Sequence, residues 1–157
     1  MRLYHASMVA VEHPDVEHSR PNLDFGRGFY LTAMHEQAVR YAARFTRRGK
    51  PAFINEYELD EELSDYVVKR FDGYDEEWLD YVSVCRHGDA PVQRYDVVEG
   101  GVANDKVFNT VDLYFAGMIS KQEALGRLKY EKPNHQICIL NGDLLEKHLH
   151  FVKAEEL

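Results

Sequence analysis

The sequence has few cysteines, no long apolar run and a deficit of basic residues. Two cysteines among 157 residues cannot build a framework of several disulfides, and a chain of this length can bury a core without one. No apolar run approaches the roughly 18 residues of a membrane-spanning helix. Lys and Arg number 19 against 27 Asp and Glu, a formal net charge of −8, which is not the electrostatic footprint of a protein that holds nucleic acid through its phosphates.

The two cysteines point to a reducing compartment. Cys85 and Cys138 each lie within an apolar run, so both are expected to be buried free thiols. The residues after Met1 show no apolar core of a signal peptide. The sequence therefore predicts a cytoplasmic protein that makes no membrane contact.

No repeat, low-complexity stretch or linker rich in Pro, Gly or Ser divides the chain, so residues 1–157 are expected to fold as one domain. Periodicity predicts strands at 2–7, 28–32, 52–59, 95–98, 135–140 and 149–152, and helices at 34–48, 75–86, 110–117 and after the capping box of Ser120 and Glu123. Because strands and helices do not alternate regularly, an α+β fold is favoured over a doubly wound parallel sheet. The insert 59–96 is interpreted as a helical cover, with a lobe that recognises an acceptor as the alternative.

The densest motif runs from Asp24 to Thr32 and reads Asp-Phe-Gly-Arg-Gly-Phe-Tyr-Leu-Thr. Its glycines, Gly26 and Gly28, permit a positive φ or a close backbone approach, so a glycine-bearing turn into a strand is one interpretation. A kinase metal motif is excluded because the catalytic-loop signature is absent. A dinucleotide fingerprint is excluded because no third glycine and no regular βαβ unit follow.

Three further segments carry polar residues at the ends of predicted strands. They read Leu-Tyr-His-Ala-Ser at 3–7, Gly-Gly-Val-Ala-Asn-Asp at 100–105 and Pro-Asn-His-Gln-Ile-Cys at 133–138. Taken singly, each has a plain structural interpretation: a histidine at a strand end, a turn, and a glutamine at a sheet edge. His148 and His150 would share one face of a strand, but no third ligand follows at a suitable spacing, so no metal site is expected.

Taken in this order, the segments resemble DUF3990, a bacterial family of unknown function that is grouped with the ADP-ribosyltransferase superfamily. The resemblance extends from about Leu3 to Phe151, and its most specific parts are Gly-Phe-Tyr-Leu-Thr at 28–32 and Val-Ala-Asn-Asp at 102–105. It implies ADP-ribosyltransferase-like split, mixed β-sheets flanked by helices. It also implies NAD as the small-molecule substrate, and a triad of a histidine, a tyrosine and an acidic or amide residue.

The resemblance assigns this triad to His5, Tyr30 and Gln136. His5 would hydrogen-bond a ribose hydroxyl of NAD, Tyr30 would stack on the cationic nicotinamide ring, and Gln136 would position the ribose. The resemblance also places the backbone of Ala6 at the nicotinamide carboxamide, and Arg27, beside Gly28, at the pyrophosphate. The hydroxyls of Ser7 and Thr32 would make outer contacts.

Active transferases of this superfamily often carry Glu at the position of Gln136. A glutamine supplies no full negative charge to the cation that forms as nicotinamide leaves, and the loss of one such group often lowers a rate by roughly 10²–10³-fold. Three interpretations follow: slow transfer, help from another carboxylate such as Asp105, or NAD binding without turnover.

The sequence thus predicts a mono-ADP-ribosyltransferase-like enzyme that cleaves the nicotinamide glycosidic bond and transfers ADP-ribose to an acceptor. The alternative is a catalytically weak NAD-binding or interaction module, for example one half of a toxin–antitoxin pair. The expected partners are NAD and a protein acceptor or antitoxin. Transfer to nucleic acid is the least favoured outcome, and a basic groove near the cleft would support it.

Overall fold

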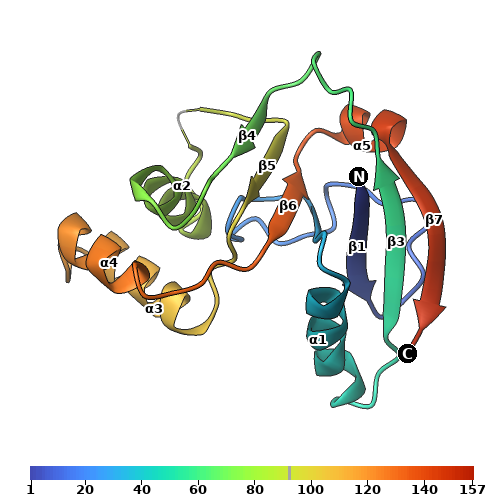
Figure 1. Cartoon of the computed structure of the whole chain (residues 1–157), viewed down its shortest axis with the longest axis horizontal. Coiled ribbons are helices and arrows are strands. Elements are labelled where there is room, and N and C mark those ends of the chain that lie inside the picture. The colour runs from blue at the N-terminus through green and yellow to red at the C-terminus, as the bar shows by residue number, and fades with distance from the viewer. Residues whose placement is uncertain (92) are drawn as a thin grey trace.

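The computed structural model describes residues 1–91 and 93–157 as an α+β fold built on two β-sheets (Figure 1). The three-stranded sheet is antiparallel and has the order β1-β3-β7, with β1 at Arg2–Ser7, β3 at Phe53–Leu59 and β7 at Leu149–Glu156. The four-stranded sheet has the order β2-β6-β5-β4, with β2 at Phe29–Leu31, β6 at Gln136–Ile139, β5 at Val97–Gly100 and β4 at Val68–Arg70. Its β4–β5 pair is parallel and the others are antiparallel, so this sheet is mixed.

Helices flank both sheets (Figure 1). α1 (His35–Thr46) packs on β1 and β3 through Ala38 and Ala42, which contact Ile54 and its neighbours. α2 (Glu76–Arg86), α3 (Asp105–Phe115) and α4 (Lys121–Leu128) form a lobe on one face of the four-stranded sheet, and α5 (Gly142–His148) joins β6 to β7. Within the described ranges, every helix is too short or too polar to span a membrane.

Strand alternation divides the apolar side chains of the four-stranded sheet between two cores. On β2, β5 and β6 the odd positions face the three-stranded sheet, where Ile137 and Ile139 meet Leu3 and Tyr57. Even positions such as Cys138 face the α2–α4 lobe. Each large side chain that is fully buried in this way contributes about 1.5–3 kcal/mol to folding. The two cores hold the sheets and the lobe in fixed positions around β2 and β6.

The two sheets are joined by an isolated backbone bridge. Tyr4 of β1 and Thr32, which follows β2, exchange two hydrogen bonds of 2.8 and 2.9 Å. Apart from this bridge, β1 and β2 form no ladder in the described part of the chain. The split arrangement expected from the sequence is therefore present, and the seam between β1 and β2 is where the segments around His5 and Tyr30 meet.

Most of the predicted elements are confirmed, with their local causes visible. The strand at 2–7 has the predicted bounds. The predicted helix at 75–86 forms α2, and the carboxylate of Asp75 caps it by accepting a hydrogen bond from the Trp78 backbone N–H. Ser120 caps α4 in the same way, since its Oγ accepts from the N–H of Glu123.

The other boundaries show where periodicity is a weak guide. β4 and α5 were not predicted, because strands of 3 residues and helices of 7 are too short to display a period. α3 begins at Asp105, ahead of the predicted start at 110, and β7 runs to Glu156 rather than to 152. The insert 59–96 contributes α2 to the helical lobe and also supplies the edge strand β4.

Gly28 lies beside β6 in a space that admits no side chain. A Cβ at this position would lie 2.5 Å from Cys138 Sγ and 2.7 Å from the Ile139 carbonyl oxygen. We expect Gly28→Ala to lower the free energy of unfolding by about 2–3 kcal/mol in urea titrations, because overpacking costs about this much and a backbone atom cannot move aside. Gly126→Ala, which meets nothing within 4 Å, is the matched control. Gly126→Ala should raise the free energy of unfolding by about 0.5–1 kcal/mol. If Gly28→Ala were as stable as the wild type, this packing would be contradicted.

Candidate functional site

His5 on β1 reaches across the seam to β2. Its Nδ1 lies 2.7 Å from the backbone carbonyl oxygen of Tyr30. A carbonyl oxygen only accepts hydrogen bonds, so Nδ1 carries the proton and the lone pair is on Nε2. The ring also packs on Phe29, with a centroid distance of 4.4 Å. Burial lowers the pKa of His5 below its ordinary value, which keeps the imidazole neutral and Nε2 an acceptor.

The hydrogen bond from His5 interrupts the pairing of β1 with β2. The backbone groups of every second residue point to the same edge of a strand, so the N–H and C=O of Ala6 face β2 as those of Tyr4 do. In a continued ladder they would pair with Tyr30, whose carbonyl oxygen is taken by His5 instead. No hydrogen bond joins Ala6 to β2 in the described part of the chain. The half-buried Ala6 therefore presents a free donor and a free acceptor at the seam.

The Tyr30 hydroxyl is fully engaged by the turn that precedes β2. It donates to the Gly26 carbonyl oxygen at 2.5 Å and accepts from the Phe25 N–H at 3.0 Å. Burial raises the pKa of Tyr30 far above its ordinary value, so the hydroxyl stays protonated at neutral pH. The hydroxyl therefore holds the turn, and the half-buried ring stacks on Phe25 with a centroid distance of 6.5 Å.

Gln136 projects from the same face of the four-stranded sheet as Tyr30. Tyr30 pairs with Cys138, so Gln136 is its diagonal neighbour on β6. The Nε2 of Gln136 donates to Asp24 Oδ2 at 2.9 Å and to the Gly101 carbonyl oxygen at 3.1 Å. Both partners are acceptors, which fixes the orientation of the amide and uses both of its hydrogens. Oε1 has no partner among the described residues and is not an enclosed atom, so it retains contact with solvent.

Asp24 organises the residues behind this site. Its carboxylate is 6% exposed and accepts from Arg86 Nη1 at 2.7 Å, from the Ala103 N–H at 2.7 Å and from Gln136. Sequence reasoning placed Asp24 in the central motif but gave it no role. Asp105, the alternative carboxylate, is exposed at the start of α3 and forms no hydrogen bond to Gln136 in the described part of the chain.

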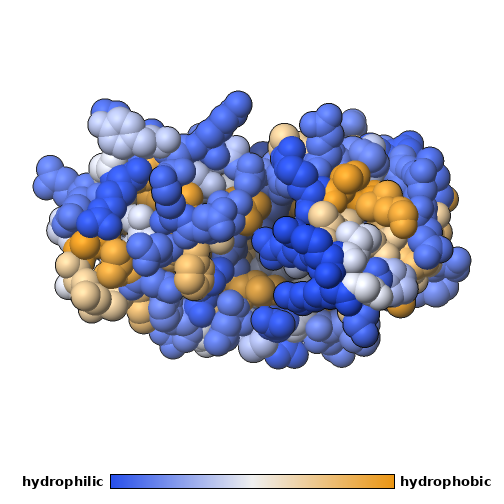
Figure 2. Space-filling view, turned by 90° about the horizontal axis from the view of Figure 1, so that it is seen from below, coloured by the Kyte–Doolittle hydropathy of each residue, from blue (hydrophilic) through white to orange (hydrophobic). Residues whose placement is uncertain are grey.

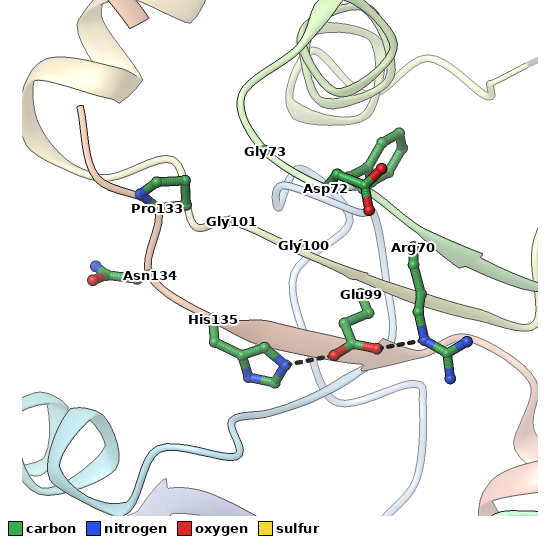
Figure 3. Close-up of a pocket in the computed structure, with 10 residues that line it drawn as sticks. Arg70, Asp72, Gly73, Glu99, Gly100, Gly101, Pro133, Asn134 and His135 are labelled. Carbon is green, nitrogen blue, oxygen red and sulfur yellow. Dashed lines mark hydrogen bonds and ion pairs between the residues drawn. The ribbon is translucent and has the colours of Figure 1, made fainter. Parts of the chain in front are cut away.

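A groove of about 310 Å³ opens where β5 ends and β6 begins (Figure 3). The Glu99 carboxylate lies in it between His135 Nε2 at 2.9 Å and Arg70 Nε at 3.0 Å. The hydrogen bond from His135, and to a lesser extent that from Arg70, lowers the pKa of Glu99, so this carboxylate is ionised at neutral pH. His135 Nδ1 accepts from the Ala33 N–H at 3.1 Å, which leaves the proton on Nε2. Sequence reasoning missed this cluster, since Arg70 and Glu99 lie outside its motifs.

The remaining predicted residues lie around the seam in varied settings. Arg27 is exposed and directed to the preceding loop, where its Nη1 contacts the Glu17 carbonyl oxygen at 3.5 Å. Gly28 is buried and its N–H donates to Ser19 Oγ at 2.9 Å. Ser7 and Thr32 both accept hydrogen bonds from nearby backbone N–H groups, at 3.4 and 3.1 Å. These hydroxyls support the loops next to β1 and β2.

The prediction that His148 and His150 share one face of a strand is wrong, because His148 ends α5 and only His150 lies in β7. Their rings converge on Asp60, with His148 Nδ1 and His150 Nε2 each 3.0 Å from one carboxylate oxygen. Over residues 1–91 and 93–157, no group of three or more His, Cys, Asp or Glu side chains is arranged to hold a metal ion.

The family described as "Protein of unknown function (DUF3990)" matches residues 1–151. The chain therefore belongs to the DUF3990 family, as the order of its motifs predicted. Comparisons with curated proteins and with solved structures gave no match. Family membership and the geometry at the seam are thus the starting points for assigning a function.

Replacing the amide of Gln136 with a carboxylate should destabilise the protein at neutral pH. In Gln136→Glu, an oxygen would stand where Nε2 now lies 2.9 Å from Asp24. The like charges repel and raise the pKa of the new glutamate in the folded state. A raised folded-state pKa makes the free energy of unfolding fall as pH rises, so the deficit against wild type should be smallest below about pH 4.3. At pH 7 we expect it to reach about 2–4 kcal/mol in urea titrations.

Gln136→Met is the matched control for this experiment. It removes the same two hydrogen bonds but adds no charge, so its deficit against wild type should change little between acidic and neutral pH. A deficit of Gln136→Glu that is equally independent of pH would show that Asp24 and residue 136 are not electrostatically coupled.

Proposed function

We propose that the protein binds NAD at the seam between β1 and β2 and acts as a slow mono-ADP-ribosyltransferase of the ADP-ribosyltransferase superfamily. The observation that carries this proposal is the free backbone pair of Ala6 beside the fixed imidazole of His5. A primary carboxamide such as that of nicotinamide has one acceptor oxygen and an NH₂ donor, so it complements the free N–H and C=O of a single residue.

Each group around the seam has one role in the proposed complex. The lone pair on His5 Nε2 accepts a hydrogen bond from a ribose hydroxyl. The Tyr30 ring offers its π-face to the cationic nicotinamide. Gln136 Oε1, held outward by its bonds to Asp24 and Gly101, accepts from a second ribose hydroxyl. The split sheets, joined at one bridge, are the arrangement that the superfamily would require, and this supports the assignment.

The reaction breaks the bond between the anomeric carbon of the ribose and the nicotinamide nitrogen. The electron pair leaves with nicotinamide, which becomes neutral, and the carbon becomes an oxocarbenium-like centre. A nucleophile on the acceptor then bonds to this carbon and releases its proton to solvent. Asp24 does not supply the missing negative charge, because Arg86 neutralises it at 2.7 Å. The dipole of Gln136 is a weaker substitute, and the loss of one charged group slows such steps by roughly 10²–10³-fold.

The buried thiols bear on where the protein acts. Cys85 and Cys138 are free and buried, as predicted from their apolar runs. Burial raises the pKa of the Cys85 thiol to about 11, so little of it is present as reactive thiolate at neutral pH. Unpaired thiols fit a reducing compartment, and we propose the cytoplasm as the site of action.

Nicotinamide release from NAD by the purified protein tests the proposed activity. We expect release above the rate of buffer alone, and a decrease of about 2–10-fold in His5→Ala, because a lost hydrogen bond between two neutral groups is worth about 0.5–1.5 kcal/mol. His13→Ala is the matched control, since His13 is exposed in the loop after β1 and should not affect the rate.

Two results would change the proposal. NAD binding in calorimetry without any release would replace the enzyme with an NAD-binding module, whose function would then depend on a partner such as an antitoxin. The absence of both binding and release, with the protein folded, would overturn the assignment of NAD to the seam.

A further inference from the structure

Basic side chains are concentrated on α1 and the turn that follows it. Residues 35–50 contain five basic residues and one acidic residue, in a chain whose formal net charge is −8. Four of these, Arg40, Arg44, Arg47 and Arg48, are named here the basic stripe. An average over the whole chain hides this local excess of positive charge.

The basic stripe lies on one face of the helix. Its members are spaced at i, i+4, i+7 and i+8, which places them along one side of α1 and its C-terminal turn over about 12 Å. All four arginines are exposed. Among the described residues, none of the ion pairs of Arg and Lys side chains involves these four arginines. The stripe therefore presents to solvent four guanidinium groups that no carboxylate of the described residues neutralises.

The helix dipole explains only part of this pattern. Basic side chains are favoured in the last turn of a helix, and Arg44 is in the last turn of α1. Arg47 Nε also donates to the Ala43 carbonyl oxygen of that turn at 3.3 Å. Arg40 lies in the middle of the helix, where the dipole gives no such preference, and Arg48 lies beyond its end. A fixed line of charge that is longer than the dipole requires is typical of a surface that tracks a polyanion.

The stripe begins at the candidate site. Gln37, one turn before Arg40, donates from Nε2 to the His135 carbonyl oxygen at 2.6 Å and accepts from the His135 N–H at 3.1 Å. This clamp ties α1 to the residue that precedes Gln136. Figure 2 shows strongly hydrophilic side chains over α1, beside the hollow that separates the α2–α4 lobe from the rest of the molecule. A chain bound along the stripe would therefore lead to the candidate site.

An exposed aromatic ring accompanies the charges. Tyr41 is 50% exposed, and the guanidinium of Arg44 lies over its ring at 4.7 Å from the centroid. Aromatic faces and guanidinium planes are the surfaces on which unpaired bases stack, beside a basic track for the phosphates. An acidic peptide would use the charges but has no flat groups for the ring. These features favour a single-stranded nucleic acid over an acidic protein.

We propose that the basic stripe binds the backbone of a single-stranded nucleic acid and presents one of its nucleotides to the seam as the acceptor of ADP-ribose. This inference rests on the proposed function and names its substrate class. A nitrogen of the base that carries a proton, or a hydroxyl oxygen of the sugar, forms the bond to the anomeric carbon. Nicotinamide leaves with the electron pair of the broken bond, and the nucleophile gives up its proton to solvent.

Binding of a fluorescent single strand of about 16 nucleotides, DNA or RNA, tests the stripe without NAD. Arg40→Gln/Arg44→Gln/Arg48→Gln should weaken binding at least about 10-fold and flatten the slope of log K against log salt by about 2, which is three phosphate contacts at about 0.7 each. The matched control, Arg20→Gln/Lys106→Gln/Lys129→Gln, removes the same charge from other exposed positions and should bind like wild type. Thermal unfolding of both variants confirms that they are folded.

Other outcomes overturn the stripe or identify a different partner. Equal losses in the two triple variants would mean that only net charge matters. Displacement of the strand by polyglutamate, as readily as by unlabelled strand, would indicate an acidic protein partner instead. No binding by the wild type at low salt would overturn the inference outright.

NAD that is radiolabelled in its ADP-ribose part separates this inference from the proposed function. Label transferred to the oligonucleotide, and lost in the stripe variant, would support both. Nicotinamide release with label on protein alone would overturn nucleic acid as the acceptor and leave the enzyme intact. Oligonucleotide binding through the stripe with no cleavage of NAD would support the binding surface and overturn the transfer step.

Discussion

The carboxylate of Asp24 joins four separate segments of the chain at one buried point. It pairs with Arg86 of α2, accepts the Ala103 N–H before α3 and holds the amide of Gln136 on β6. Removing one partner of such a buried pair commonly costs about 3–5 kcal/mol, because the other charge is left without compensation. The site depends on the same contact, since Asp24 orients Gln136, Gln136 lies beside Tyr30, and the Tyr30 hydroxyl closes the turn that follows Asp24.

This constraint gives a physical reason for an amide at position 136. The two atoms that face the Nε2 of Gln136 are a carboxylate oxygen of Asp24 and the Gly101 carbonyl oxygen, both acceptors. A glutamine supplies two donors to them and turns its own oxygen outward, whereas a glutamate would oppose both. Glutamine at position 136 is thus favoured by the packing, although it would give weaker catalysis than glutamate. This links the expected slow turnover to the stability of the fold.

Sequence reasoning succeeded where the information is local and failed where it is not. The pattern around β1 and α2 is periodic, and the order of the motifs identified the family. The partners of Asp24 lie 62 and 112 residues away at Arg86 and Gln136, and no local period reports such a contact. The basic stripe was missed because a net charge of −8 argued against it, although the arginines are plainly spaced along one helix. Arg27 was expected at a pyrophosphate, and its exposed side chain reaches the preceding loop.

The backbone amide of Ala6 is the most direct reporter of the proposed NAD site, since it would bond the carboxamide without any side chain taking part. We would record amide NMR spectra of the protein during titration with nicotinamide and then with NAD. A saturable downfield shift of the Ala6 amide proton, together with changes in the His5 ring signals, is the predicted result, because a new hydrogen bond deshields its proton. Saturable binding that leaves Ala6 and His5 unchanged would contradict the seam as the site of NAD binding.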